Sequence, residues 1–353
     1  MKKKIVIAYG TRPEAIKLFL LVKALSKKYE VITIFTGQHQ DLIDNTLIPK
    51  PDYSIMVKQP MWIEALRDIF IAEQPNLVIC QGDTDSALAI AMAGFYNKIP
   101  VGHVEAGLRS HNINSPFPEE FNRIVIDKIS DYHWCPTTQN AFNCLQEGLS
   151  NIIITGNTIV DTVNYLKPKI STNNNIIVTL HRRENECYFK GMLTQINDLA
   201  LEYDSYNFVF PVHPNPIISG KTSILKAKNI QIIEPLPYSD MLRLIASCTG
   251  IISDSGGICE EACALNKKIL ICRDSTERSE AIDCGIGKLV GCKIKDNFNW
   301  LLEPSKTIAN PFGAGNAVDA IVQSLFANTN QQWLKTVKTV KMTKEQKLRM
   351  LSI

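Results

Sequence analysis

The sequence lacks the features that would place it among membrane, secreted or nucleic-acid-binding proteins. No uninterrupted apolar stretch approaches the ~18 residues that a membrane-spanning helix needs, and the apolar run after the first lysines is too short for a secretory signal. The 38 basic and 35 acidic residues leave a net charge of only +3, which does not indicate nucleic-acid binding. We therefore expect a cytoplasmic protein that binds neither membranes nor nucleic acid.

Signatures of metals, disulfides and dinucleotide cofactors are also missing. The ten cysteines are scattered among apolar segments and no two of them are spaced CxxC, so we expect reduced thiols and no metal site. No GxGxxG segment follows a predicted strand, as it would in an NAD-binding protein. We therefore expect no cofactor.

Short apolar runs alternate with amphipathic stretches along the chain, a pattern typical of parallel α/β sheets. Strands are predicted at residues 4–9, 31–36, 76–81, 99–104, 132–135, 151–155, 175–180, 207–212, 230–233, 250–253, 268–272 and 287–290. A polar segment at residues 167–175 interrupts the alternation and is the best linker in the chain. The predicted fold class is therefore α/β, with two Rossmann-like doubly wound domains that face a central cleft.

The domain boundaries follow from this linker. We predict an N-terminal domain at residues 1–167 and a C-terminal domain at residues 175–330. Basic residues cluster in the remaining segment, 331–353. We interpret that segment as a tail that is either solvated or folded as a helix against the N-terminal domain.

Polar segments follow many of the predicted strands, where ligands of doubly wound sheets bind. These segments are "QGDT" (81–84), "HVEAGLR" (103–109), "HRREN" (181–185), "HPNP" (213–216), "DSGGICEE" (254–261) and "RDSTER" (273–278). The same edge of each sheet is therefore expected to carry the functional side chains.

The segment "DSGGICEE" has the features of a phosphate site. Ser255, Gly256 and Gly257 lie between a strand and a helix, where backbone N–H groups and the helix dipole favour an anion and small residues let it approach. An ordinary N-capped turn would give the same pattern. Glu261, in the first turns of the helix, either accepts hydrogen bonds from ribose hydroxyls, which we favour, or complements the dipole.

The segment "GTRPEAIK" (10–17) begins the first helix with two cations. Thr11 and Glu14 fit a capping box and Pro13 suits the first turn, so helix initiation explains these residues. Arg12 and Lys17 need another explanation. Arg12 at the strand end would face the cleft and bind phosphate, whereas Lys17 alone would also fit a solvated helix position.

Acidic residues near strand ends indicate a second kind of chemistry. Asp83, Glu105 and Glu119 follow strands or begin helices, and we expect some of them to share the cleft with His181. Carboxylates repel a diphosphate, so they are more suited to a neutral sugar ring, where they could transfer protons. Glu119 taken alone would also fit an ordinary acid at a helix start.

The motifs of this chain, taken in their order along the sequence, resemble those of the non-hydrolysing UDP-N-acetylglucosamine 2-epimerases. They include "GTRPEAIK", "TGQH", "QGDT", "PVGHVEAGLRS", "PFPEEFNRIVID", "TGNTIVD", "HRREN", "HPNP", "DSGGICEE", "TERSE" and "NPFGAGNA", from about residue 5 to about residue 325. The resemblance implies a GT-B-like pair of Rossmann domains in a homodimer. It also implies interconversion of UDP-N-acetylglucosamine and UDP-N-acetylmannosamine, a precursor of bacterial surface polysaccharides.

The resemblance also implies roles for individual residues. The implied catalytic set is Asp83, Glu105, Glu119 and His181. The implied UDP-binding residues are Arg12, Lys17, Ser255, Gly256, Gly257, Glu261 and Arg278. Leu236 and Met241 match positions that line the family's uracil site, and His213 matches a further pocket residue.

The chemistry of the sugar is consistent with that family's mechanism. The hydrogen on C2 lies next to an acetal carbon, so its removal needs an electron sink, which departure of UDP from C1 provides. This route passes through 2-acetamidoglucal and needs no redox cofactor. The sequence does not indicate which acid removes the proton and which one returns it.

Several positions differ from the family's usual residues. Asp85, Cys259 and Ser279 could adapt the site to a diacetamido uronic acid or a 6-deoxy sugar, and a shortened segment between "TGQH" and "QGDT" leaves activation by a second UDP-sugar open. A GT-B glycosyltransferase or a non-catalytic nucleotide-sugar sensor would share the phosphate site. The first needs an acceptor groove, and the second would tolerate loss of the acids.

Overall fold

The chain forms two compact α/β units. The computed structural model describes residues 2–38, 47–182, 185–212 and 220–326. The N-terminal unit comprises Met1–Thr162 together with the chain from Gly313, and the C-terminal unit comprises Val163–Phe312. The predicted boundary at 167 thus differs by a few residues, and residues 313–326 group with the first unit although they were assigned to the second. The predicted tail, 331–353, lies outside the described residues.

A parallel sheet of seven strands, in the order β3-β2-β1-β4-β5-β6-β7, forms the centre of the N-terminal unit. Its strands are β1 (Lys4–Tyr9), β2 (Glu30–Phe35), β3 (Tyr53–Ser54), β4 (Leu77–Gln81), β5 (Val101–Val104), β6 (Tyr132–Cys135) and β7 (Ile152–Ile154). Its helices are α1 (Arg12–Leu25), α2 (Trp62–Glu73), α3 (Asp85–Tyr96), α4 (Glu119–Ile129), α5 (Thr138–Gln146), α6 (Thr158–Leu166) and α13 (Ala317–Ser324). A short 3-10 helix spans Gln59–Met61.

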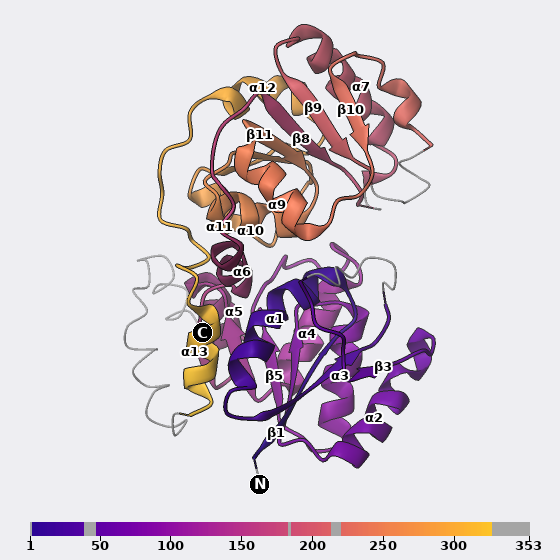
Figure 1. Cartoon of the computed structure of the whole chain (residues 1–353), viewed down its shortest axis with the longest axis vertical. Coiled ribbons are helices and arrows are strands. Elements are labelled where there is room, and N and C mark those ends of the chain that lie inside the picture. The colour runs from indigo at the N-terminus through magenta and orange to yellow at the C-terminus, as the bar shows by residue number, and fades with distance from the viewer. Residues whose placement is uncertain (1, 39–46, 183–184, 213–219, 327–353) are drawn as a thin grey trace. The chain divides into compact units, whose positions relative to one another are not determined.

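The C-terminal unit repeats this design with six parallel strands in the order β10-β9-β8-β11-β12-β13. The strands are β8 (Asn175–Thr179), β9 (Asn207–Pro211), β10 (Ile230–Ile233), β11 (Gly250–Ser253), β12 (Ile269–Ile271) and β13 (Gly287–Leu289). The helices are α7 (Phe189–Glu202), α9 (Tyr238–Ser247), α10 (Gly256–Ala264), α11 (Ser279–Asp283) and α12 (Ile294–Leu302), with a 3-10 helix at Thr222–Ile224. The α/β fold class with two doubly wound sheets is therefore confirmed (Figure 1).

The strand order defines where each unit can bind a ligand. Successive strands run in one direction from β1 and in the other from β4, and the same reversal occurs between β8 and β11. In open parallel sheets, ligands bind beyond the carboxyl ends of the strands at such a reversal. The segments "GTRPEAIK" and "QGDT" follow β1 and β4, whereas "HRREN" and "DSGGICEE" follow β8 and β11.

The central strands of both sheets are buried on two faces, as their continuous apolar runs predict. Every residue of β4 and of β11 is buried. In the N-terminal unit, α3 contacts both α2 and α4, whereas α13 contacts α1. The predicted capping box is present at the start of α1, where the side chain of Glu14 reaches back to Thr11. This cap fixes the turn between β1 and α1.

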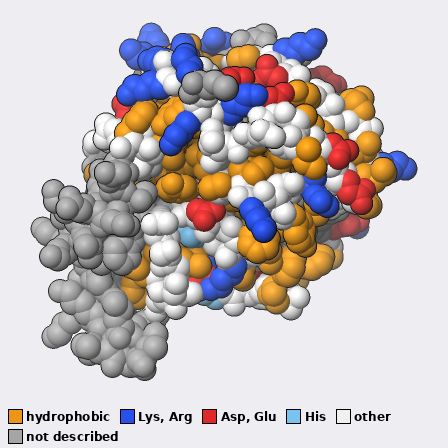
Figure 2. All heavy atoms as spheres, turned by 90° about the horizontal axis from the view of Figure 1, so that it is seen from below, with side chains coloured by type: hydrophobic (Ala, Val, Ile, Leu, Met, Phe, Trp, Pro, Cys, Tyr) orange, Lys and Arg blue, Asp and Glu red, His pale blue; other side chains and the backbone are white. Residues whose placement is uncertain are grey.

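The surface mixes polar and apolar groups. On the face in Figure 2, hydrophobic side chains form patches that charged side chains interrupt. Within the described part of the chain, no helix is both long and apolar enough to cross a membrane, and no group of His, Cys, Asp and Glu residues could hold a metal ion. The cysteines of these regions are free thiols.

Candidate functional site

Glu105 is the most unusual acidic residue at the strand ends of the N-terminal unit. It directly follows β5, is only 6% exposed, and has a backbone φ of +73°, which is rare for a residue with a side chain. Its Oε2 atom forms an ion pair with Lys17 Nζ and accepts hydrogen bonds from Gln81 (3.1 Å) and Asn157 (3.2 Å). Such strain and burial concentrate at functional sites, because the surrounding structure must stabilise them.

Lys17 is therefore held differently from a solvated helix residue. It is 5% exposed, lies within the second turn of α1, and contacts the Glu105 carboxylate from a sequence distance of 88 residues. The alternative interpretation of Lys17, as an ordinary lysine at a solvated helix position, is therefore wrong. Its predicted role in binding UDP stays a prediction.

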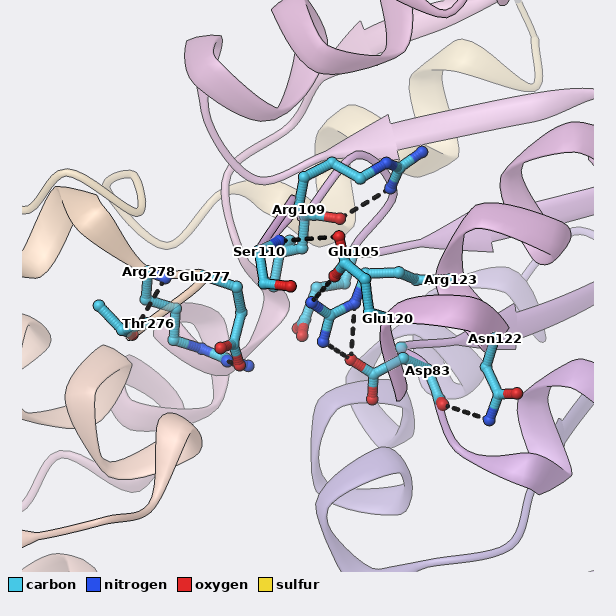
Figure 3. A network of polar contacts seen from close by, with 12 residues as sticks. Asp83, Glu105, Arg109, Ser110, Glu120, Asn122, Arg123, Thr276, Glu277 and Arg278 are labelled. Carbon is cyan, nitrogen blue, oxygen red and sulfur yellow. Dashed lines mark hydrogen bonds and ion pairs between the residues drawn. The ribbon is translucent and has the colours of Figure 1, made fainter. Parts of the chain in front are cut away.

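Asp83 lies two residues after the end of β4 and is paired with an arginine from α4. Its Oδ2 atom accepts hydrogen bonds from two nitrogens of Arg123, with Nε at 3.1 Å, and Asn122 donates to the Asp83 carbonyl at 2.9 Å. The other side of the Arg123 guanidinium donates to Glu120 Oε2 at 2.8 Å. Figure 3 shows Arg123 extended between Asp83 and Glu120. The Asp83 side chain keeps 22% of its surface exposed, so it remains open to a ligand.

Glu119 and Arg12 both occupy helix starts. Glu119 is the first residue of α4, and Arg12 is the first residue of α1; both are half-buried. Helix N-termini favour negative charge, so the Glu119 position alone fits an ordinary helix-start acid. A cation at such an end gains nothing from the dipole, which makes an anionic ligand a suitable neighbour for Arg12.

Glu14 connects the turns after β1 and β4. Its Oε2 atom accepts hydrogen bonds from the backbone of Gly10 (3.0 Å) and Thr11 (2.7 Å), and its Oε1 atom accepts from Thr84 Oγ1 at 2.7 Å. Burial raises the pKa of the Glu14 carboxyl, against the opposing effect of these hydrogen bonds. Glu14 therefore joins the turn of Arg12 to the turn of Asp83.

The C-terminal unit contains the predicted phosphate site at the start of α10. Ser255 is the N-cap residue, and Gly256 and Gly257 are the first two residues of the helix. Arg278 lies against Gly256, because a Cβ atom built there would lie 2.5 Å from Arg278 Nη1. Nothing lies within 4 Å of a Cβ atom built at Gly257. The site thus combines the N-terminus of a helix, a guanidinium and open space at Gly257.

Buried acids hold Arg278 at this position. Arg278 Nε donates to Glu260 Oε1 at 2.6 Å, and its Nη1 donates to Glu277, which also accepts from Arg273 at 2.9 Å. Figure 3 includes Arg278 and Glu277. Burial raises the pKa of Cys259, which lies in α10, to about 12, so its thiol is neutral at ordinary pH.

His181 is oriented by an acid that the sequence analysis did not single out. Asp254 is fully buried and accepts from the backbone N–H of His181 (3.0 Å) and of Arg182 (2.9 Å). His181 Nδ1 lies 3.4 Å from Asp254 Oδ1, and Asn185 Nδ2 donates to the same carboxylate at 3.1 Å. The His181 side chain remains 33% exposed. One carboxylate therefore anchors His181, Arg182 and Asn185 close to the predicted phosphate site in the sequence.

The remaining predicted residues occupy less informative positions. Leu236 precedes α9 and Met241 lies in its first turn, and both are half-buried. Glu261 lies in α10 and is 7% exposed. His213 lies outside the described residues. The roles predicted for Leu236, Met241, Glu261 and His213 therefore stay predictions.

Asp254, Arg123 and Glu120 are the principal residues that sequence reasoning missed. Asp254 had a usable signal, since it directly follows a buried strand and precedes the two glycines. Arg123 and Glu120 are three residues apart on a helix, a spacing that places them on one face. Their partners lie in distant segments, so the spacing alone could not identify them.

Together, these features define a class of protein. Two doubly wound parallel sheets, together with the related solved structures described below, make this a GT-B-like α/β protein of the Rossmann type. The family model for UDP-N-acetylglucosamine 2-epimerase matches residues 23–326. The chain belongs to the UDP-N-acetylglucosamine 2-epimerase family, a family of isomerases.

Individual relatives agree with this family. A UDP-N-acetylglucosamine 2-epimerase from Campylobacter jejuni is 36% identical over 384 residues, which cover 94% of this chain and 100% of the relative. The crystal structure of the Neisseria meningitidis epimerase bound to UDP-GlcNAc has a TM-score of 0.86 at 34% identity, covering 92% and 100% of the two chains. The Methanocaldococcus jannaschii enzyme in complex with UDP-GlcNAc and UDP has a TM-score of 0.82 at 32% identity, covering 92% and 99%.

Proposed function

We propose that this protein interconverts UDP-N-acetylglucosamine and UDP-N-acetylmannosamine by inverting C2 of the sugar. The observation that carries this proposal is the arrangement around Glu105, a strained and buried acid paired with Lys17 at a strand end. A carboxylate held in this way is suited to proton transfer. Family membership and the UDP-GlcNAc bound to two related structures support the choice of substrate.

In the proposed reaction, UDP leaves before the sugar is inverted. A carboxylate removes the C2 proton while the C1–O bond to UDP breaks, and the electron pair of the C–H bond forms the C1=C2 double bond of 2-acetamidoglucal. A second acid then delivers a proton to the opposite face of C2, and a β-phosphate oxygen of UDP adds back to C1. Asp83, Glu105, Glu119 and His181 form the proposed proton-transfer set.

The C-terminal unit is proposed to hold UDP during this sequence. Gly256 and Gly257 offer backbone N–H groups to a phosphate, and Arg278 adds a positive charge. Ser255, whose own N–H donates to Ser253 Oγ at 3.0 Å, offers its hydroxyl. Arg12 and Lys17 are proposed as further cations for the leaving group, Glu261 for the ribose, and Leu236 and Met241 for the uracil. Cations fixed before the reaction stabilise the charge that develops on UDP as it departs.

The positions that differ from the family have local structural explanations. Asp85 accepts a hydrogen bond from Asn122 at 3.0 Å, and Cys259 is buried with its thiol 3.5 Å from the Ser255 carbonyl. Ser279 is an exposed residue at the start of α11. None of these contacts favours a uronic acid or a 6-deoxy sugar over N-acetylglucosamine.

Incubation with UDP-N-acetylglucosamine, followed by proton NMR of the anomeric region, tests the proposal. We expect a new UDP-linked N-acetylmannosamine signal and a stable mixture of the two UDP-sugars. Free N-acetylmannosamine would indicate a hydrolysing enzyme, and sugar transfer to an added acceptor would indicate a glycosyltransferase. No change in the spectrum would contradict the proposal. The homodimer and the cytoplasmic location stay predictions, and sedimentation and cell fractionation would test them.

A further inference from the structure

Three charged side chains lie on one buried face of α4. Glu120, Arg123 and Asp127 are spaced i, i+3 and i+7, and none of them is more than 2% exposed. Charges are rarely buried unless they are paired, because leaving water is costly. Most partners of these three residues lie in or beside the turns that carry Asp83 (residues 82–85) and Glu105 (residues 105–111).

Asp127 binds the turn of Glu105. Its Oδ2 atom accepts from the Gly107 backbone N–H at 3.1 Å and from Arg109 Nη2 at 2.8 Å. Gly107 lies two residues after Glu105 and has a φ of +82°, and a Cβ atom there would meet the Asn140 carbonyl oxygen at 2.2 Å. The Gly107 backbone therefore packs too closely against Asn140 to leave room for a side chain, and Asp127 fixes that backbone by accepting from its N–H.

Asp127 reaches the turn of Asp83 through His103. Its Oδ1 atom lies 2.6 Å from His103 Nδ1, and His103 Nε2 lies 2.8 Å from the Gly82 carbonyl oxygen. Gly82 directly precedes Asp83. Both ring nitrogens face oxygen atoms, so the His103 ring bridges the Asp127 carboxylate and the Gly82 carbonyl.

The charge of Asp127 suits this arrangement. Burial alone would raise its pKa, but the positive charges of His103, Arg109 and His133 outweigh burial and hold the pKa of Asp127 well below its usual range. A carboxylate that stays ionised keeps all its acceptor sites. It can therefore bind Gly107, Arg109 and His103 at the same time.

Glu120 completes the set on the same helix face. Its Oε1 atom accepts from the backbone N–H of Ser110 (2.9 Å) and of His111 (3.0 Å), and its Oε2 atom binds Arg123, the partner of Asp83. Every charged residue of this α4 face thus contacts one of the two acid-bearing turns or a residue that does.

We propose that this buried face of α4, acting with His103, fixes the separation of Asp83 and Glu105, and that Asp127 and His103 are positioning residues for the proton transfer. The inference rests on the proposed function, because it assigns these residues to the same reaction. Asp127 and His103 act through the Gly107 N–H and the Gly82 carbonyl. A purely structural network would instead lower stability and leave the turnover of the folded enzyme unchanged.

Asp127→Asn tests this distinction, with Glu147→Gln as a matched control. Glu147 is the other carboxylate that binds Arg109, with Nε at 2.6 Å, whereas Asp127 also binds the Gly107 N–H and His103. We expect Asp127→Asn to lower kcat by about 10- to 100-fold, because small displacements of reacting groups are costly, while KM stays within about twofold. Glu147→Gln should keep the wild-type kcat. Equal effects of the two substitutions on kcat would overturn the proposal.

Two substitutions of His103 separate its two contacts. The amide nitrogen of Gln matches the position of Nε2, and that of Asn matches Nδ1, so His103→Gln can keep the Gly82 contact and His103→Asn the Asp127 contact. We expect His103→Asn to lower kcat by about tenfold or more and His103→Gln to retain more activity. The reverse order would overturn the role given to the Gly82 contact, and this comparison decides the matter if Asp127→Asn does not fold.

Hydrogen exchange measured by mass spectrometry gives a readout that does not depend on the substrate. Asp127→Asn should speed amide exchange in peptides that cover residues 82–85 and 105–111, and Glu147→Gln should not. If the wild-type protein did not convert UDP-N-acetylglucosamine but these turns were loosened, the proposed function would fail while the positioning role held. Unchanged exchange together with an unchanged kcat would overturn the positioning role.

Discussion

Glu105 shows how one residue can reveal a site. A positive φ and nearly complete burial are both unfavourable for a glutamate, and Lys17, Gln81 and Asn157 offset part of the cost by donating to one of its oxygens. A residue needed only for stability would not require this conformation. The sequence predicted that Glu105 would be functional from its position after a buried strand, but not its strain or its donors.

Replacing Glu105 with Gln should separate proton transfer from binding. Gln keeps the shape of the side chain but cannot transfer a proton, so we expect turnover to fall by about 100-fold or more while UDP affinity stays near wild type. Steady-state kinetics and calorimetry with UDP measure the two effects. Equal losses of rate and affinity would make Glu105 a binding or structural residue.

Gly256 is the residue at which an added methyl group is most informative. A Cβ atom there would lie 2.5 Å from Arg278 Nη1, so Gly256→Ala must displace the guanidinium. We expect UDP binding to weaken by about 2 kcal/mol through the loss of charge-assisted contacts, as calorimetry would measure.

Two other glycines serve as controls for Gly256. A Cβ atom at Gly257 or at Gly191 has nothing within 4 Å, so both alanine variants should fold as stably as the wild type. Gly191 lies in α7 and should not affect UDP binding, whereas Gly257→Ala should weaken it if a phosphate approaches that residue. Wild-type affinity in a folded Gly256→Ala variant would contradict the assigned phosphate site.

At the level of elements, α13 depends on a cap from a distant helix. The carboxylate of Asp161, in α6, accepts from the N–H groups of Ala317 and Val318, both at 3.1 Å. These groups have no partner within their own helix. The contact explains why the chain from Gly313 belongs with the N-terminal unit, which the sequence did not predict, because the cap lies more than 150 residues from α13.

Removing this cap should release α13. We expect Asp161→Ala to lower the free energy of unfolding by about 1–2 kcal/mol, as for other lost caps, and Asp161→Asn to cost less because an acceptor oxygen remains. Urea denaturation followed by circular dichroism would measure both variants. Equal stability of the wild type and Asp161→Ala would show that the cap is dispensable.

The sequence predicted elements better than contacts. All twelve predicted strands are present, with ends that differ by two residues or fewer, because buried parallel strands form continuous apolar runs. The two-residue strand β3 (Tyr53–Ser54) was missed, since it is too short to produce a pattern. The pairs Asp83–Arg123 and His181–Asp254 join residues 40 and 73 positions apart, so only the folded chain brings them together.

Lowering the pH should reduce the contribution of the α4 network to the free energy of unfolding of the whole molecule. The pKa of Asp127 is depressed in the folded state, so its contribution to stability is complete above the ordinary Asp pKa of about 4 and is lost as pH falls toward its lower folded value. Asp127→Asn should therefore be most destabilising near pH 6, with a smaller difference from wild type at pH 3. Urea midpoints at the two values measure this, and a difference that does not change with pH would contradict it.

In the function proposed for the whole molecule, the C-terminal unit binds UDP, and acids of the N-terminal unit carry out most of the proton transfer. Elimination requires both parts, since UDP must stay bound while the sugar is an unattached glycal. Transient oxidation of the ring would need neither a leaving group nor the cations that hold it. The two routes therefore differ in whether the C1–O bond breaks.

Isotopic labelling distinguishes these routes directly. UDP-N-acetylglucosamine carrying oxygen-18 in the bridge between the sugar and the β-phosphate would be incubated with the enzyme in D2O, and both positions followed by NMR. We expect deuterium at C2 of the product and movement of the label into non-bridging positions of the β-phosphate. Deuterium at C2 with the bridging oxygen wholly retained would contradict the elimination of UDP and the roles proposed for Arg12, Lys17 and the Ser255–Gly257 segment.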